Sequence, residues 1–156
     1  MDLKHLLTKH GPPIHVLSEA EAEKLLQLPP QKTPVVVRRV RGHKAKTTSS
    51  LFDEMAAALQ FPSYFGENWN ALDECLNDLE WLPGDAYVLV FERGPELLSL
   101  ESPTEFQSLL QVLTQASLEW QKRNKPFHTV LGCNEPEEKA FTQKLKAAKV
   151  DLGYRS

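Results

Sequence analysis

The chain has 156 residues, 41% of them hydrophobic and 25% charged, a balance typical of one globular domain with a substantial core. It contains no run of 18 or more apolar residues, which excludes a membrane span, and its first 13 residues lack the apolar segment of a signal peptide. Its two cysteines, Cys75 and Cys133, belong to no CxxC motif, so we expect free buried thiols and a cytoplasmic location.

The net charge of −3 is distributed unevenly along the chain. Residues 31–46 include six bases and no acid: Lys32, Arg38, Arg39, Arg41, Lys44 and Lys46. Residues 61–85 include six acids and no base: Glu67, Asp73, Glu74, Asp78, Glu80 and Asp85. Like charges without internal partners repel one another and cost stability. This acidic block therefore indicates a function that uses its electrostatic field.

The first predicted element is a short amphipathic helix. The capping-box pair Ser18 and Glu21 predicts its start, and the helix is expected to end near Leu28. Prolines then form a stiff connector, and the valine-rich segment 35–40 predicts the first strand.

A second helix follows this strand, with Ser49 or Ser50 as its cap, and ends before Pro62.

Further along the chain, the pattern predicts a helix over 67–81, with a break expected near its end, and a buried strand over 87–91. Ser102 begins a long helix that ends near residue 124, a third strand covers 128–132, and a closing helix lies around 141–148.

The order of these elements predicts an α/β fold with a small three-stranded parallel sheet packed with helices, because each strand pair is separated by a helical crossover. We expect a central domain over residues 35–132, an N-terminal helical extension over 1–34, and a C-terminal helical extension over 133–156 packed on the same domain.

The segment 61–82, FPSYFGENWNALDECLNDLEWL, is the most informative part of the chain. Helical spacing places the apolar residues Trp69, Leu72, Leu76 and Leu79 on one core-facing stripe. The opposite side is expected to carry Asn70, Glu74, Asn77, Asp78 and Trp81, with Asp73 at its margin. Tyr64 and Phe65 lie in the turn before the helix, so the pattern predicts acids, amides and an aromatic side chain together on the surface.

A solvated polar face is the simplest interpretation of this pattern. Two features argue against it. No Lys or Arg lies four residues away to pair with the carboxylates, although a surface that serves solubility mixes both signs. An aromatic side chain is also expected beside the acids, and aromatic side chains are enriched at the centres of protein interfaces.

These residues resemble the signature of the barstar family of intracellular ribonuclease inhibitors. The resemblance is carried by Tyr64-Phe65-Gly66-Glu67-Asn68, followed by Ala71-Leu72 and Leu76, and it extends over residues 35–132. It implies a binding protein without enzymatic activity, cofactor or metal, which inserts this helix and the preceding loop into the active-site cleft of a ribonuclease. Acidic side chains then take the place of substrate phosphates among the basic groups of the nuclease.

The resemblance implies six partner-binding positions: Tyr64, Asn68, Asn70, Asp73, Glu74 and Asp78. Four positions depart from the family pattern. Asn70 replaces an aspartate, Glu74 replaces a shorter aspartate, Asp73 stands where the founding member has tryptophan, and Gln115 aligns with an acid of a later helix. The expected partner is therefore a basic ribonuclease or nuclease toxin other than barnase itself, bound by a chain that is a monomer when free.

Three other functions stay open at the level of the sequence. An enzyme would use Asp73, Glu74 and Asp78 as acid, base or metal ligands, but no second catalytic cluster accompanies them. A nucleic-acid-binding module would use the basic segment 38–46, although no aromatic residue is interspersed there. A regulatory or scaffold protein would keep the fold and have lost inhibition through the changes at Asn70 and Gln115.

Overall fold

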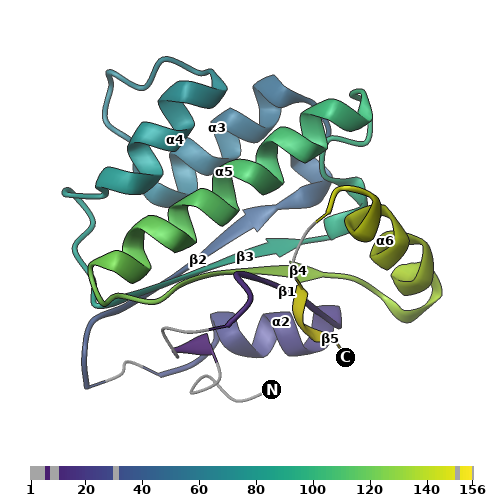
Figure 1. Ribbon diagram of the computed structural model, residues 1–156, viewed down its shortest axis with the longest axis horizontal. Helices are drawn as coiled ribbons and strands as arrows, with labels where there is room; N and C mark the ends of the chain where they lie inside the picture. The colour runs from purple at the N-terminus through teal and green to yellow at the C-terminus, as the bar shows by residue number, and fades with distance from the viewer. Residues whose placement is uncertain (1–5, 8–10, 30–31, 150–151, 156) are drawn as a thin grey trace.

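The computed structural model describes residues 6–7, 11–29 and 32–149, together with the backbone of 152–155. It contains one sheet of five parallel strands in the order β2-β3-β4-β1-β5 (Figure 1). The strands are β1 (Ile14–Leu17), β2 (Val35–Arg41), β3 (Ala86–Glu92), β4 (Phe127–Gly132) and β5 (Leu152–Arg155). The helices are α2 (Glu19–Leu26), α3 (Thr48–Leu59), α4 (Trp69–Asp78), α5 (Pro103–Lys122) and α6 (Glu135–Ala147), with short 3-10 turns η1 (Gly42–Lys44) and η2 (Gly94–Glu96).

The prediction of a small three-stranded sheet is wrong, because two further strands extend the sheet beyond β4. Strand β1 pairs with β4 from Ile14 opposite Thr129 to Leu17 opposite Gly132, and β5 pairs with β1 on its other side. The sequence of β1, Ile-His-Val-Leu, is too short to show a period, and all four of its residues are buried. Part of the expected N-terminal extension therefore belongs to the central sheet.

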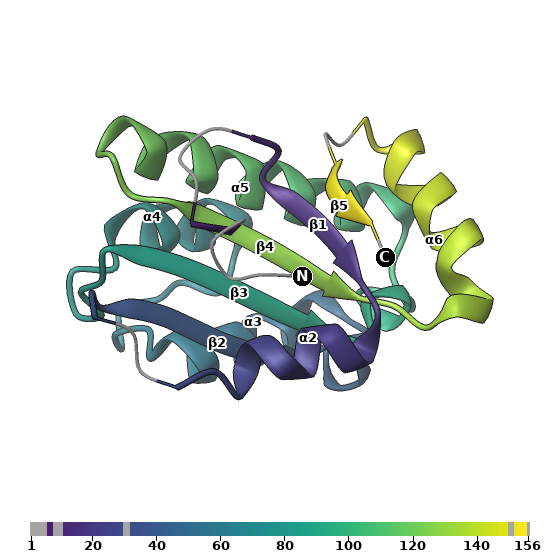
Figure 2. The ribbon, with the colours of Figure 1, turned by 90° about the horizontal axis from the view of Figure 1, so that it is seen from below.

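Helices cover both faces of the sheet, as parallel strands require. Helices α3, α4 and α5 lie on one face, whereas α2 crosses the other face beneath the central strands (Figures 1 and 2). On the α2 side, Leu17, Ala22 and Leu25 pack in one apolar cluster with Val88 and Val130 of the central strands. Residues 14–26 thus bury a face of the sheet that would otherwise be exposed to water.

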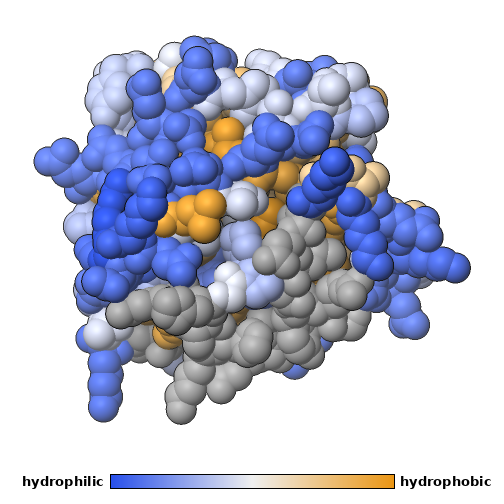
Figure 3. Space-filling model, in the orientation of Figure 1, coloured by the Kyte–Doolittle hydropathy of each residue, from blue (hydrophilic) through white to orange (hydrophobic). Residues whose placement is uncertain are grey.

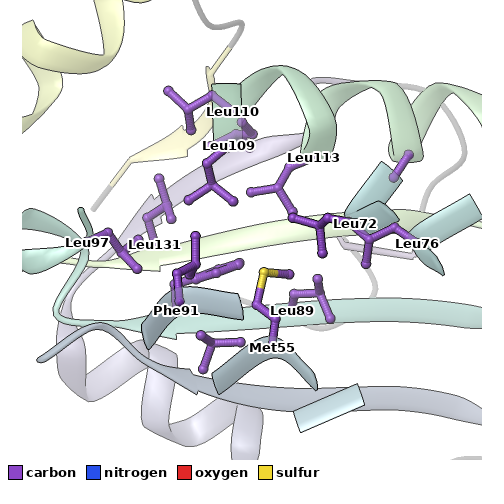
Figure 4. Packing of buried hydrophobic residues seen from close by; sticks show 14 of the residues in the cluster. Met55, Leu72, Leu76, Leu89, Phe91, Leu97, Leu109, Leu110, Leu113 and Leu131 are labelled. Carbon is purple, nitrogen blue, oxygen red and sulfur yellow. The ribbon is translucent and has the colours of Figure 1, made fainter. Parts of the chain in front are cut away.

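The larger part of the core lies between the sheet and helices α3 to α5. Met55 of α3, Leu72 and Leu76 of α4, and Leu113 of α5 point toward Leu89 of β3 (Figure 4). All five side chains are fully buried. The apolar stripe predicted for α4 is thereby confirmed in its central residues, and it fixes which side of this helix faces outward.

A polar contact closes the junction between β1 and β4. The rings of His15 and His128 are almost fully buried, and their Nε2 and Nδ1 atoms lie 3.0 Å apart in a hydrogen bond. A hydrogen bond of this kind removes much of the cost of burying two polar rings. The two cysteines, Cys75 and Cys133, are free and buried, as the sequence predicted.

The helix starts agree with the sequence at some positions and differ at others. Ser18 accepts a hydrogen bond from the backbone N–H of Glu21, as its capping pattern predicted. The cap of α3 is Thr47, however, and the prediction of Ser49 or Ser50 as that cap is wrong. Ser50 is instead the third helical residue. Its backbone N–H donates to Oγ1 of Thr47, and its Oγ accepts from the backbone N–H of Thr47, which completes a capping box.

We predict that Leu17→Ala lowers the free energy of unfolding by about 3 kcal/mol, because it opens a cavity where β1 packs under α2. The matched control is Leu28→Ala, which changes an exposed leucine just after α2 and should cost less than about 0.5 kcal/mol. Urea unfolding measures both. Equal effects of the two substitutions would contradict the inclusion of β1 in the core.

Candidate partner-binding surface

The loop before α4 is held by a cluster of aromatic rings. Phe65 packs against Phe52 and Phe61, with ring centroids 6.0 and 4.9 Å apart. Trp69 packs edge-on against Phe52 at 5.1 Å, and Trp81 packs edge-on against Phe61 at 6.2 Å. A tight turn closes within the loop, where the N–H of Phe65 donates to the carbonyl of Pro62. Such ring contacts add to the burial energy and fix the path of the loop.

Helix α4 begins at Trp69 and ends at Asp78, so the predicted helix over 67–81 is too long at both ends. Leu79 adopts a left-handed conformation with φ of 46° and ends the helix. Trp81 consequently lies outside the helix, where its indole N–H donates to the carbonyl of Leu59 at 2.9 Å. The prediction that Trp81 shares the exposed polar face of the helix is wrong.

Asn68 is the cap of α4. Its Oδ1 accepts a hydrogen bond from the N–H of Ala71 at 2.8 Å, and its Nδ2 donates to the carbonyl of Gly66 at 3.1 Å. The side chain therefore satisfies a free N–H at the helix start and fixes the preceding turn. Its predicted contact with a partner stays a prediction, but its role in the loop follows from these bonds.

Three hydrogen bonds fasten α4 to α5. The indole N–H of Trp69 donates to the Glu105 carboxylate at 3.0 Å, and that of Trp120 donates to the carbonyl of Leu76 at 2.7 Å. Arg123 donates to the carbonyl of Asn77 at 2.6 Å while its guanidinium stacks 4.4 Å above the Trp120 ring. These contacts span the whole helix, so its outer face is presented in one orientation.

That outer face carries most of the predicted site residues. Asn70, Glu74 and Asp78 are exposed on α4. Asp73 is half-buried and lies four residues from both Trp69 and Asn77, which contact α5, so it borders the junction with α5. Asn77 is half-buried as well, with its Oδ1 atom covered. The sequence pattern had predicted Asn77 on the side of the helix opposite the core-facing stripe.

Tyr64 is 70% exposed at the tip of the loop. Loss of hydration around its hydroxyl, and then the negative charge of the nearby Asp78 carboxylate, raise the pKa of its phenol. The Tyr64 hydroxyl is thus within electrostatic reach of Asp78 in the last turn of α4.

The acidic residues between 61 and 85 and the basic residues between 31 and 46 differ in whether they form ion pairs within the chain. Among the described residues, none of the six acids between residues 61 and 85 forms an ion pair. In the basic segment, Arg39 contacts Glu23 and Glu92, Arg41 contacts Glu54 at 2.6 Å, and Lys46 contacts Glu96. The negative charges of the acidic block are therefore not balanced by ion pairs within the described residues. Several bases of the basic segment, in contrast, are paired with acids of this chain.

Gln115 lies exposed on α5, and its Nε2 donates to the Glu119 carboxylate at 3.1 Å. Glu119 also forms an ion pair with Lys122 at 3.0 Å, which lowers the pKa of Glu119. A carboxylate therefore does lie one turn from Gln115, but a neighbouring ammonium balances its charge. Sequence reasoning considered only position 115 and missed Glu119, although the spacing of four residues was visible.

The surface over α4 and α5 is largely hydrophilic, with smaller apolar areas between the charged side chains (Figure 3). Within the described part of the chain, no three His, Cys, Asp or Glu side chains come together as a possible metal site. No described helix is long and apolar enough to cross a membrane.

A family model described as Barstar (barnase inhibitor) matches residues 35–132, more than half of the chain. The chain belongs to the barstar family. The matched region includes the loop, α4 and α5, and it ends with β4, so β1, α2, α6 and β5 lie outside it. The resemblance inferred from the segment at residues 64–76 is confirmed. None of the curated proteins compared with the chain matches it.

Solved structures with a similar fold come from a different group of proteins. The ORC2 protein of Aeropyrum pernix, in ADPNP–ADP complexes, is 13% identical over 99% of this chain and 44% of its own, with a TM-score of 0.60. A chain of Drosophila ORC bound to GC-rich DNA and Cdc6 is 12% identical over 98% of this chain and 26% of its own, with a TM-score of 0.56. This barstar-family chain thus spans less than half of either neighbour, and the likeness concerns the fold alone.

We predict that Asn68→Ala lowers the free energy of unfolding by about 1 kcal/mol, because it removes the cap of α4. The matched control is Asn70→Ala, two residues later on the exposed face, which should change stability by less than about 0.5 kcal/mol. Thermal and urea unfolding measure both variants. A loss of stability at position 70 as large as that at position 68 would argue against the capping role.

Proposed function

We propose that this chain is an inhibitor or immunity protein that blocks the active site of a basic ribonuclease or nuclease toxin with α4 and the loop before it. The observation that carries the proposal is the set of acids on α4, which have no ion-pair partner among the described residues. Membership of a family described by its inhibition of barnase supports the same function.

The physical basis is competition for cations. A ribonuclease active site gathers Arg, Lys and His to hold a polyanionic substrate, and carboxylates on a rigid helix bind the same groups without a phosphodiester bond to cleave. Because α4 is fastened to α5 at three places, binding costs little ordering of the inhibitor. The unpaired acids also attract a basic partner over long distances and accelerate association.

Five of the six predicted contact residues, all except the half-buried Asp73, are exposed. Glu74, Asn70 and Asp78 are exposed and available to a partner, and Tyr64 extends the surface into the loop. We propose that the chain acts as a monomer in the cytoplasm. The buried free thiols of Cys75 and Cys133 support a reducing location.

The ORC2 protein is described in complexes with ADPNP and ADP, and its fold is similar to that of this chain. The residues of this chain nevertheless do not favour nucleotide binding. Phosphate loops of such folds contain several glycines between the first strand and its helix. Here only Ser18 separates β1 from α2. The Glu19 carboxylate occupies the adjacent space, lying so close to Gly132 that a Cβ atom there would collide with it. A carboxylate at this position repels phosphate.

Nucleic-acid binding is disfavoured as well, because Arg39, Arg41 and Lys46 are already paired with acids of this chain. A regulatory protein that has lost inhibition is the principal alternative. An inhibition assay separates it from the proposed function.

We predict that the purified chain inhibits at least one member of a panel of secreted basic ribonucleases other than barnase, at one-to-one stoichiometry. Association should slow steeply as the salt concentration rises, because charge steering is screened. Glu74→Lys should weaken inhibition about a hundred-fold, since a like charge then faces the basic cleft. Fluorogenic RNA cleavage and stopped-flow association measure these effects.

The matched control is Asp53→Lys, which makes the same change of sign at an exposed position on α3. It should leave inhibition within a few-fold of the wild-type value. The proposal is wrong if no basic ribonuclease is inhibited, or if Glu74→Lys and Asp53→Lys weaken inhibition equally.

A further inference from the structure

Strand β2 forms one border of the sheet, because β3 lies on one side of it and no described strand lies on the other (Figure 2). It pairs with β3 in parallel over its whole length, from Val35 opposite Ala86 to Arg41 opposite Glu92. Alternate residues of a strand direct their backbone N–H and C=O groups to opposite sides. About half of these groups in β2 therefore point away from β3.

The outer side of β2 is open. Within the part of the chain that the structure describes, no hydrogen bond outside the β2–β3 ladder involves the backbone of 35–41. The side chains of Val35, Val36 and Val37 are only half-buried, and Pro34 before them is exposed. A border strand with free backbone groups and partly exposed valines is a template on which another extended segment can pair.

Three bases along this border have no ion-pair partner among the described residues: Lys32 before the strand, Arg38 at its centre and Lys44 just after it. Arg39 and Arg41, in contrast, are paired with acids of this chain. The Nε atom of Arg38 is covered by protein and has no hydrogen-bond partner in the described part of the chain. The border therefore carries uncompensated positive charge, with an unsatisfied donor group at its centre.

We propose that β2 binds an extended acidic segment of a partner protein, which joins the sheet as a further strand. The backbone of the segment pairs with the open side of β2, as in other cases of strand addition. A carboxylate of the segment accepts from the Arg38 guanidinium, and its apolar side chains cover the half-buried valines. This binding goes beyond the proposed function, because β2 contributes no residue to α4 or to the loop before it.

A second copy of this chain fits the border less well than an acidic segment. Antiparallel pairing of two whole β2 strands brings Arg38 of one copy opposite Arg38 of the other, and like charges directly opposite each other destabilise a sheet. Charged side chains on border strands commonly prevent such pairing. An acidic segment is instead attracted by each of the three bases without ion pairs. The charge of the border thus selects an occupant of opposite sign.

The test uses the full chain and a peptide of alternating Glu and Val with blocked ends, as long as the seven residues of β2. A second peptide has Lys in place of Glu. Fluorescence anisotropy at low salt measures the affinities, and hydrogen exchange of backbone N–H groups locates the bound peptide. We expect the Glu peptide to bind at least about ten-fold more tightly than the Lys peptide and to slow exchange in β2.

Backbone methylation of the peptide separates strand pairing from charge attraction. One version of the Glu peptide is N-methylated at its Glu residues and another at its Val residues, so each lacks one alternate set of N–H donors. Because only one set faces β2, one version should lose binding and the other should keep it within a few-fold. Equal affinities of the two methylated versions would overturn the addition of a strand.

Arg38→Gln should weaken binding of the Glu peptide about ten-fold, because it removes the charge and keeps a polar side chain. The matched control is Lys139→Gln, which removes an exposed charge without a described ion pair on α6 and should leave the affinity within two-fold. Equal losses in the two variants, or slowed exchange only outside β2, would contradict the proposal. A dimer of the free chain with β2 protected would assign the border to a second copy and overturn it.

Ribonuclease inhibition is measured separately on the same variants. Arg38→Gln should leave inhibition within a few-fold of the wild-type value, because Arg38 lies outside α4 and the loop. Inhibition without peptide binding contradicts strand addition alone. Peptide binding without inhibition of any ribonuclease supports strand addition and contradicts only the proposed function.

Discussion

The presentation of the acidic surface depends on the indole N–H groups of the three tryptophans. Trp69 donates to Glu105, Trp120 donates to the carbonyl of Leu76, and Trp81 donates to the carbonyl of Leu59. Two of these bonds join α4 to α5, and the third joins the segment after α4 to the end of α3, while each ring packs in the hydrophobic core or against it. A buried indole combines a large apolar area with one directional donor, so it fixes both the distance and the orientation of two elements. The loop and α4 are held in place by these contacts, with little dependence on their own helix propensity.

This rigidity has an electrostatic consequence. Six acids without ion pairs within the described residues lie in one stretch of 25 residues, and their mutual repulsion opposes folding. The apolar contacts of Leu72, Leu76 and the aromatic rings must offset it, because no basic side chain among the described residues forms an ion pair with these acids. A surface destabilised in this way gains most when a cationic partner approaches, since binding relieves the repulsion and adds attraction. The bases of the preceding block behave in the opposite manner, with Arg39 and Arg41 paired inside the chain.

The spacing of apolar residues in the sequence was sufficient to predict the long, regular helices and strands of the fold. The apolar runs of β3 and β4 and the stripe of α5 were predicted within a few residues, because long buried elements have strong periodic signals. Strand β1 was missed because four residues carry no period, and its place at the edge of β4 is decided by tertiary packing. In the site, the pairing of Asn68 with Gly66 and Ala71, and of Glu119 with Gln115, depends on side-chain geometry that spacing alone does not determine.

The carboxylates of α4 are distributed from one flank of the helix to the other. Asp73 is half-buried beside α5, Glu74 stands on the exposed crest, and Asp78 lies next to Tyr64, so the carboxylates follow the helix from one flank to the other. Asn70, near the start of the helix, offers a polar amide but adds no charge there. The negative potential is therefore shifted toward the end of α4 and the tyrosine of the loop. In the function proposed above, the arrangement of carboxylates along this one helix selects the partner whose cations match it.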